Sequence, residues 1–333
     1  MRAIVCHTYG PYSNLKLEAF PRPTLPARGV RIAIDYASVS FATTLVVAGK
    51  YQRKPPLPFV PGTEVVGIVT EIAAGVTACT VGDRVLAILD WGGFAEEACV
   101  TEHTVYRLPA LIDSTHALHA GISYGTAYGA LVWRGKLNAG ENLLVLGAAG
   151  GVGLAAVELG HALGARVIAA ASHADKCALA RAHGADDTIN YSTEDLRERT
   201  KALTQGRGAD VVFDPIGGDL FDTALRAIAM EGRMLTIGYA SGRIPSIPAN
   251  ILLVKDLTVA GFNFGAYVGW SPVDERARFE KQMRAMYTKI FDWVIDGTLR
   301  PVVSDVLPLE HYVQAQDLVI SRQAAGKVLL KVR

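Results

Sequence analysis

The sequence predicts an α/β protein in which a doubly wound parallel sheet is inserted between two parts of a β-rich domain. Residues up to about 117 form short β-rich runs broken by glycine and proline. Residues 118–264 alternate apolar strands with helical stretches, and from about 265 this alternation stops. A chain of 333 residues, half of them hydrophobic, has enough material for two cores. We therefore predict one domain from 1–117 and 265–333, and a second from 118–264.

The first domain is predicted to be an irregular barrel or roll. Its clearest β-rich runs lie at 30–36, 65–72 and 83–88. After the second domain a helix is predicted near 274–296. Two later runs, 302–307 and 327–332, are expected as strands that return to the first domain.

The second domain is predicted to alternate strand and helix along its length. The expected strands are 142–146, 165–170, 209–214, 233–237 and 257–262. The expected helices between them are 152–163, 175–183, 193–204 and 220–229. This order is typical of a doubly wound, Rossmann-type sheet.

Composition excludes several classes of partner. The 33 basic residues nearly cancel the 32 acidic ones, so no field of one sign attracts nucleic acid. No apolar run reaches the roughly 20 residues that span a bilayer, and the first residues lack a secretory pattern. The cysteines are scattered, which fits a reducing compartment; they are Cys6, Cys79, Cys99 and Cys177. We expect a cytoplasmic protein with no membrane or nucleic-acid partner.

A glycine-rich turn at 147–153 is the strongest motif. It follows the apolar run 143–146 and leads into an amphipathic stretch, the order that a dinucleotide site requires. The bare backbone at Gly150 admits a pyrophosphate, Gly153 allows close packing of helix on strand, and the helix start favours an anion. Ala148 stands where the first glycine is usual. The predicted cofactor-binding residues here are Ala149, Gly150, Gly151, Val152 and Gly153.

The end of the next strand indicates which dinucleotide binds. An acidic residue about 20 positions after the turn would bind an unphosphorylated ribose. Here the strand ends at Ala171, and Ser172 and Lys176 follow, so nothing repels a 2′-phosphate. Asp175 is interpreted as a charge in the first turn of a helix. The sequence therefore favours NADPH over NADH.

Motifs along almost the whole chain resemble the medium-chain dehydrogenase/reductase superfamily, and within it the NADPH:quinone oxidoreductase-like family. They lie at 48–51, 58–67, 82–85, 124–128, 147–153, 214–218 and 326–328. The resemblance implies that the β-rich catalytic domain is GroES-like and that the inserted domain is a Rossmann domain. It also implies a homodimer, formed through an exposed sheet-edge strand near 257–262.

The resemblance places further residues at the cofactor. Tyr191 and Arg322 match positions that contact the 2′-phosphate beside Lys176. Thr126, Gly238 and Asn263 match positions that line the nicotinamide and phosphate portions of the cofactor. Ile216, in the 214–218 motif, is also predicted to contact the cofactor.

The same resemblance predicts that the protein works without zinc. Ser40 and Thr63 stand where zinc-dependent alcohol dehydrogenases of the superfamily have a cysteine and a histidine, and neither is a useful zinc ligand. No metal is therefore expected. Ser40 and Thr43 also replace an asparagine and an aspartate usual in the family, which leaves their effect on substrate choice open.

The proton donor has two candidates. Tyr51 matches the tyrosine proposed as donor in related enoyl thioester reductases, but water is an equal alternative because a tyrosine is a weak acid. Thr63 is expected either to hydrogen-bond the nicotinamide or acceptor, or to be a buried strand-end residue. The predicted substrate pocket comprises Ser40, Phe41, Tyr51, Trp91 and Phe264, with Tyr267 and Trp270 as further aromatic candidates.

The predicted function is NADPH-dependent, zinc-independent reduction of a quinone or another α,β-unsaturated carbonyl compound by hydride transfer. One alternative is reduction of an enoyl thioester or unsaturated acid, for which Lys50, Arg53 and Lys54 offer positive charge. Another is a non-catalytic NADPH-binding structural or RNA-associated protein. The balanced charge argues against RNA binding.

Overall fold

The computed structural model describes residues 1–321 and 324–333 and divides into two compact units. The first unit comprises Met1–Ile122, Phe264–Asp296 and Pro301–Arg333, and the second Ser123–Asn263 with Gly297–Arg300. The first boundary lies slightly beyond the predicted residue 117. The short return 297–300 was not predicted.

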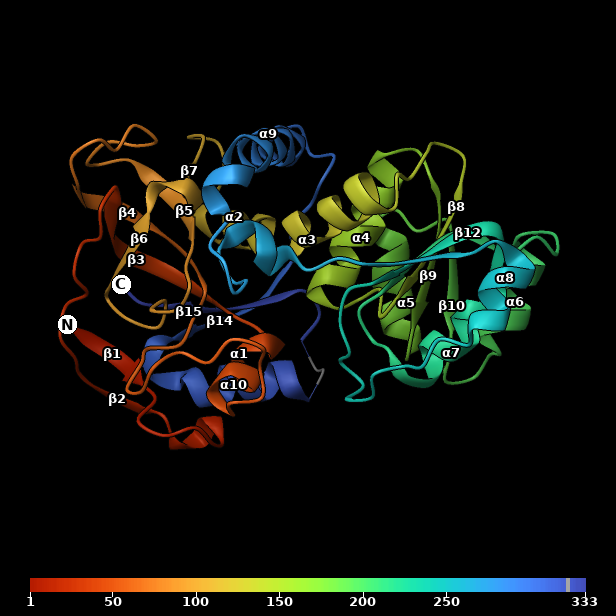
Figure 1. The fold of residues 1–333 in the computed structure, drawn as a ribbon, viewed down its shortest axis with the longest axis horizontal. Coiled ribbons are helices and arrows are strands. Elements are labelled where there is room, and N and C mark those ends of the chain that lie inside the picture. The colour runs from red at the N-terminus through yellow and green to blue at the C-terminus, as the bar shows by residue number, and fades with distance from the viewer. Residues whose placement is uncertain (322–323) are drawn as a thin grey trace. The chain divides into compact units, whose positions relative to one another are not determined.

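The first unit, which contains both ends of the chain, is built on a mixed sheet (Figure 1). Its order is β14–β15–β3–β4–β5–β7, and β6 also pairs with β3. The strands are β3 (Gly29–Val39), β4 (Glu64–Ile72), β5 (Arg84–Ile88), β6 (Glu97–Thr101), β7 (Val105–Arg107), β14 (Val303–Pro308) and β15 (Lys327–Lys331). Because β15 pairs antiparallel with β3, the predicted return of the C-terminal strands to this domain is confirmed.

A pair of strands and four helices outside the main sheet are also described in the first unit. A separate antiparallel pair joins β1 (Arg2–Val5) to β2 (Lys16–Ala19). The helices are α1 (Phe41–Val47), α2 (Ser114–His119), α9 (Arg276–Ile295) and α10 (Tyr312–Ile320). Alternate residues of β3, among them Ile32 and Ile34, are fully buried and belong to the hydrophobic core of this unit.

The second unit holds a parallel sheet of the doubly wound type. Its order is β10–β9–β8–β11–β12–β13, and each neighbouring pair is parallel. The strands are β8 (Asn142–Leu146), β9 (Arg166–Ala171), β10 (Asp187–Asn190), β11 (Ala209–Asp214), β12 (Ile228–Thr236) and β13 (Thr258–Gly261). The order reverses between β8 and β11, where open sheets of this kind bind ligands. The predicted Rossmann fold is confirmed.

Helices alternate with these strands. They are α3 (Gly125–Tyr128), α4 (Gly151–Ala162), α5 (Ala174–Ala182), α6 (Leu196–Leu203), α7 (Gly218–Ala227) and α8 (Ala249–Lys255). Residues 143–146 of β8 are wholly buried, as a strand covered on both faces requires. Helices α3 and α8 and strand β10 were not predicted. Helix α7 ends at Ala227 instead of 229 because β12 begins at Ile228.

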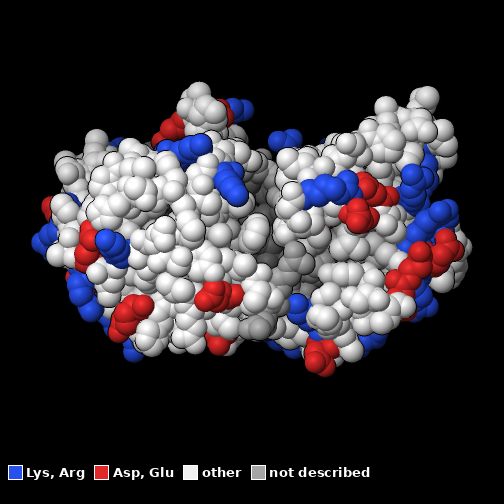
Figure 2. Space-filling model, turned by 90° about the horizontal axis from the view of Figure 1, so that it is seen from below, with Lys and Arg blue, Asp and Glu red and all other residues white. Residues whose placement is uncertain are grey.

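Charge is evenly distributed on the face drawn in Figure 2. Lysine and arginine side chains alternate there with aspartate and glutamate, with no continuous patch of one sign. Within the described residues, no helix is both long enough and apolar enough to cross a membrane.

Candidate active site

The glycine-rich turn connects β8 to α4 in the second unit. Its left-handed residue is Gly147, with φ +61°, and Ala148 does not need a positive φ. Ala148 is buried, and its N–H donates to the carbonyl of Ala170 at 3.1 Å. The alanine in place of the usual first glycine is therefore accommodated, because the residue before it makes the tight turn.

Two later glycines in the turn have different roles. A Cβ on Gly153 would lie 2.2 Å from the carbonyl oxygen of Gly147, so only glycine fits between helix and turn. A Cβ on Gly150 would meet only that same oxygen, at 3.5 Å. Gly150 is also the residue that precedes α4, with extended φ −77° and ψ 163°. Packing does not require glycine at position 150, so the missing side chain leaves space for a ligand at the start of α4.

The other predicted cofactor residues lie along one edge of the sheet. Ser172, Tyr191, Ile216, Gly238 and Asn263 follow the ends of β9, β10, β11, β12 and β13 in turn. Because all these strands are parallel, their carboxyl ends share the edge at which β8 enters the glycine turn. Ile216 packs against that turn, since a Cβ on Gly147 would lie 2.7 Å from its Cδ1. Thr126 lies in α3 and is buried.

The predicted 2′-phosphate site is assembled from two adjacent strand ends. The N–H of Tyr191 donates to the carbonyl of Ala171 at 3.1 Å. The hydroxyl of Ser192 donates to the carbonyl of Ser172 at 2.8 Å. Lys176 lies near the start of α5, in which Asp175 occupies the first turn as expected. Arg322 lies outside the described residues.

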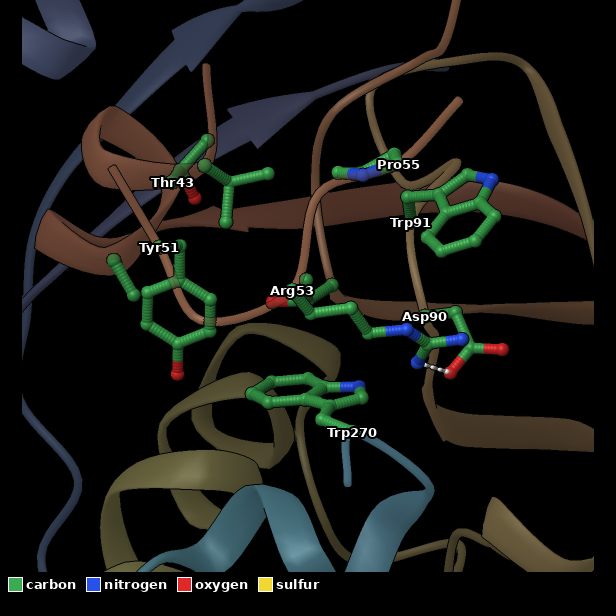
Figure 3. Close-up of a pocket in the computed structure, with 10 residues that line it drawn as sticks. Thr43, Tyr51, Arg53, Pro55, Asp90, Trp91 and Trp270 are labelled. Atoms are coloured by element: carbon green, nitrogen blue, oxygen red, sulfur yellow. Dashed lines mark hydrogen bonds and ion pairs between the residues drawn. The ribbon is translucent and has the colours of Figure 1, made fainter. Parts of the chain in front are cut away.

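The first unit contains a narrow cavity of about 30 Å³ (Figure 3). Its walls are Ala42, Thr43, Val46, Tyr51, Arg53, Pro55, Thr63, Asp90, Trp91 and Trp270. The cavity has room for a group only slightly larger than one water molecule. It therefore admits one small end of a larger molecule.

Four of the predicted residues line this cavity: Tyr51, Thr63, Trp91 and Trp270. Four others do not: Ser40, Phe41, Phe264 and Tyr267, whose ring packs against Phe279. The Ser40 hydroxyl accepts from the N–H of Thr43 at 3.3 Å and thereby caps α1. Phe41 is the first residue of α1 and is 39% exposed, whereas Phe264 is buried.

Tyr51 presents an unpartnered hydroxyl. The side chain is half-buried, and its oxygen makes no hydrogen bond with any residue that the structure describes. Burial raises the pKa of Tyr51 above its usual value, because desolvation penalises the phenolate. The hydroxyl thus stays protonated at neutral pH and can donate.

Thr63 is fixed by its neighbours. Its carbonyl accepts from the N–H of Leu89 at 2.8 Å. Next to it, Glu64 is wholly buried, accepts from the hydroxyl of Ser38 at 2.6 Å and pairs with Lys327 Nζ at 2.8 Å. This buried ion pair joins β4 to β15 and holds the start of β4, and with it Thr63, in place.

Asp90 was not predicted from the sequence, and Arg53 was predicted only as positive charge for an enoyl thioester or unsaturated acid. Their side chains form an ion pair at 2.7 Å, and Asp90 also pairs with Arg276. These residues come from a loop, a strand end and the start of a helix. No local pattern marks contacts between such distant segments.

A zinc ion does not fit Ser40 and Thr63, the residues that stand where zinc-dependent members of the superfamily have a cysteine and a histidine. Ser40 Oγ is engaged in capping α1, and Thr63 offers a neutral hydroxyl. Within 1–321 and 324–333, no three histidine, cysteine, aspartate or glutamate side chains are grouped to hold a metal.

Comparison with known proteins agrees with this geometry. Residues 26–110 match the alcohol dehydrogenase GroES-like domain, and 151–286 match a family described as zinc-binding dehydrogenase. The second match includes neither Ser40 nor Thr63. The chain is 37% identical to quinone oxidoreductase-like protein 2 homolog of Nematostella vectensis, over 100% of this chain and 89% of that protein. It belongs to the quinone oxidoreductase-like family of the medium-chain dehydrogenase/reductase superfamily.

Solved structures of similar proteins have the same fold. Escherichia coli quinone oxidoreductase, in complex with NADPH, superposes with a TM-score of 0.90 at 28% identity over the whole of both chains. A 2-haloacrylate reductase gives 0.86 at 29% identity, again over the whole of both chains. The chain is thus a quinone oxidoreductase-like oxidoreductase.

Proposed function

We propose that this protein uses NADPH, without zinc, to reduce quinones or other α,β-unsaturated carbonyl compounds by hydride transfer. The observation that carries the proposal is the cavity of the first unit. It is walled by Trp91 and Trp270 and presents the free hydroxyl of Tyr51, but it offers no set of metal ligands among the described residues. A conjugated carbonyl is already electrophilic, so its reduction can proceed in a cavity with this lining. Oxidation of an alcohol would be helped by a Lewis acid, which this lining is not suited to hold.

The residues of the second unit fit NADPH. The turn at 149–153 would hold the pyrophosphate at the start of α4. Ser172, Lys176 and Tyr191, with Arg322, would bind the 2′-phosphate, and Thr126, Ile216, Gly238 and Asn263 would line the remainder. When bound, NADPH supplies the hydride. The NADPH in the E. coli neighbour supports this cofactor.

The first unit positions the acceptor and supplies the proton. The two tryptophans offer flat apolar faces, and Thr63, which also lines the cavity, would hydrogen-bond the acceptor. The proton that follows the hydride would come from Tyr51, which holds its proton at neutral pH, or from water. The cavity is small, so only the carbonyl end of the acceptor enters it.

Reduction of an unsaturated acid or thioester at its carbon–carbon bond is the second candidate. Two observations favour it: Arg53 lines the cavity, and a 2-haloacrylate reductase has the same fold. A non-catalytic NADPH-binding role is the remaining alternative.

We also propose a cytoplasmic homodimer with no nucleic-acid or membrane partner. The free cysteines fit a reducing compartment. Among the described strands, β13 pairs with β12 alone and forms an edge of its sheet, on which a second copy could pair. Sedimentation of the wild type against a variant with proline at Val259 tests this: a monomeric wild type would contradict the dimer.

The function is tested by NADPH oxidation with a panel of quinones, enones, unsaturated acids and enoyl thioesters. We expect turnover with quinones or enones, and a loss of about 10²-fold or more in kcat for Tyr51→Phe if the tyrosine is the donor. Tyr36→Phe is the matched control, because Tyr36 lies in β3 of the same unit and does not line the cavity. No turnover with any acceptor would leave only the non-catalytic role, and full activity of Tyr51→Phe would assign the proton to water.

A further inference from the structure

Arg53 crosses the cavity with one edge of its guanidinium fixed. Its Nη1 donates to Asp90 Oδ1 at 2.7 Å and to the carbonyl of Gly269 at 2.9 Å. Its guanidinium carbon lies 4.9 Å from the ring centroid of Trp91. Figure 3 shows the side chain extending from its loop to Asp90. The Nε and Nη2 atoms donate no hydrogen bond to any described residue, so these donors remain available to a ligand.

Arg53 shares its counter-ion with a second arginine. Asp90 also accepts from Arg276 Nη2, at 2.9 and 3.2 Å to its two oxygens. Arg276 is only 5% exposed, so its guanidinium depends strongly on a counter-ion. It has a second carboxylate partner, since its Nε lies 2.8 Å from Asp274 Oδ1. Asp90 is therefore divided between two guanidinium groups, and its one contact with Arg53, at Nη1, leaves the other N–H groups of that side chain unused.

The arrangement is also rigid. A Cβ on Gly269 would lie 2.0 Å from Arg276 Nη2, so the backbone that accepts from Arg53 packs directly on the buried arginine. Beside it, Trp270 Nε1 donates to the carbonyl of Leu89 at 3.0 Å. Preorganised donors of this kind stabilise charge that develops during a reaction, because they need no reorientation.

The proposed reaction produces such a charge. NADPH, when bound, would supply the hydride by cleavage of its nicotinamide C–H bond and would be oxidised to NADP⁺. As the new C–H bond forms at the electron-poor carbon of an enone or quinone, a π electron pair moves to the carbonyl oxygen. The product is an enolate, which becomes neutral when a proton arrives. A preorganised hydrogen-bond donor that faces this oxygen would stabilise the charge.

We propose that the free N–H groups of Arg53 bind this oxygen and stabilise its negative charge, which makes Arg53 a catalytic residue of the pocket. The inference rests on the proposed function. The guanidinium stays protonated throughout, so Tyr51 or water still supplies the proton. The roughly 30 Å³ of the cavity suit the oxygen-bearing end of the acceptor.

A binding experiment tests the anion site without turnover. The probes are 4-cyanophenol, titrated from its neutral to its phenolate form, and its methyl ether, which stays neutral. Binding is followed by quenching of tryptophan fluorescence, since Trp91 and Trp270 line the cavity. We expect the wild type to bind the phenolate at least tenfold more tightly than the ether. Arg53→Met should lose this preference while it retains the affinity for the ether.

Lys54→Met is the matched control. It removes the same charge from the next residue, which is exposed and does not line the cavity. It should keep the phenolate preference, and Arg53→Lys should keep part of it. If Arg53→Met retains the preference, or Lys54→Met loses it equally, the proposal is overturned. Melting curves show whether a variant has unfolded. If Arg53→Met has unfolded, the phenolate preference of Arg53→Lys decides the result.

Turnover separates this inference from the proposed function. With a quinone or enone, Arg53→Met should lower kcat about 10²–10³-fold with a smaller change in KM, and Arg53→Lys should restore much of it. If Arg53 only held Asp90 and the Gly269 carbonyl in place, Nη1 would be sufficient. Loss of that structural role would not lower kcat more than it changes KM. An active wild type with an equally active Arg53→Met refutes the inference and leaves the function standing. An inactive wild type whose phenolate binding depends on Arg53 refutes the function and leaves the anion site standing.

Discussion

The two candidate binding regions are built in different ways. In the second unit, the turn at 147–153 is one continuous segment, and its fit depends on backbone and on absent side chains. In the first unit, the cavity depends on side chains from separate segments: Arg53 meets Asp90 across 37 positions, and Asp90 meets Arg276 across 186. A backbone site therefore tolerates almost no added atom, whereas a side-chain site is sensitive to changes of charge.

The largest effect is expected where an atom is added to the turn. Gly153→Ala places a Cβ 2.2 Å from a carbonyl oxygen, so it should lower the melting temperature and abolish measurable NADPH binding. Gly150→Ala has space within the protein and should fold normally, but bind NADPH at least tenfold more weakly. Calorimetry of both variants measures this. Equal melting temperatures would show that the turn relaxes and that the contrast with the cavity is overstated.

In the first unit, the corresponding change is the loss of a charge. Lys327→Met leaves the wholly buried Glu64 without its counter-ion and should lower the free energy of unfolding by about 3–5 kcal/mol. Urea denaturation measures it. Arg278→Met, which removes an exposed ion pair with Glu275, should barely move the midpoint. Equal effects of the two variants would argue against a structural role for the buried pair.

An added charge should also change the cofactor preference. Ser172→Asp places a carboxylate at the end of β9, where it repels a 2′-phosphate and can accept from a ribose hydroxyl. NADPH affinity should fall about 10–100-fold while NADH affinity holds or rises. Fluorescence titration with both nucleotides checks it. Unchanged NADPH binding would show that the 2′-phosphate lies elsewhere.

Alkaline pH should weaken both units. Burial raises the pKa of Tyr106 and Tyr287 in the first unit and of Tyr124 in the second, where the phenol also donates to Glu158. Above pH of about 10 the unfolded chain loses these protons while the folded chain keeps them, so stability falls as pH rises. Urea midpoints at pH 8, 10 and 11 should decrease in that order. A constant midpoint would contradict the raised pKa values.

The smallest effect concerns the thiols. Burial, with the nearby Asp83 and Glu102, raises the pKa of Cys79 to about 11, and burial also raises those of Cys6, Cys99 and Cys177. Little thiolate exists at pH 8, so the native protein should react slowly with a disulfide reagent. Unfolding in guanidinium should release four equivalents of thiol. Rapid reaction of the native protein would point to an accessible thiolate.

The contrast explains what the sequence could predict. The segment 143–163 encodes strand, turn and helix locally, so both the Rossmann fold and the position of the glycine turn followed from it. Strand β10 was not predicted because it has only four residues, 187–190, and most of them are polar. The sequence alone does not show whether the turn accommodates Ala148. The backbone does, because its left-handed conformation lies at Gly147.

The cavity was less predictable. Tyr51 and Trp91 could be proposed from family motifs and residue type, but Ser40, Phe41 and Phe264 do not line it. Asp90 follows a strand like many aspartates, and its significance comes only from the two arginines that tertiary folding brings to it. Long-range charge pairing leaves no periodic pattern in a sequence.

The most direct test of the account is the rate of NADPH oxidation with a quinone before and after exhaustive metal chelation. The account predicts turnover that chelation leaves unchanged and that prefers NADPH to NADH. Turnover that disappears on chelation and returns with added zinc would contradict it, as would the absence of turnover with every acceptor of the panel.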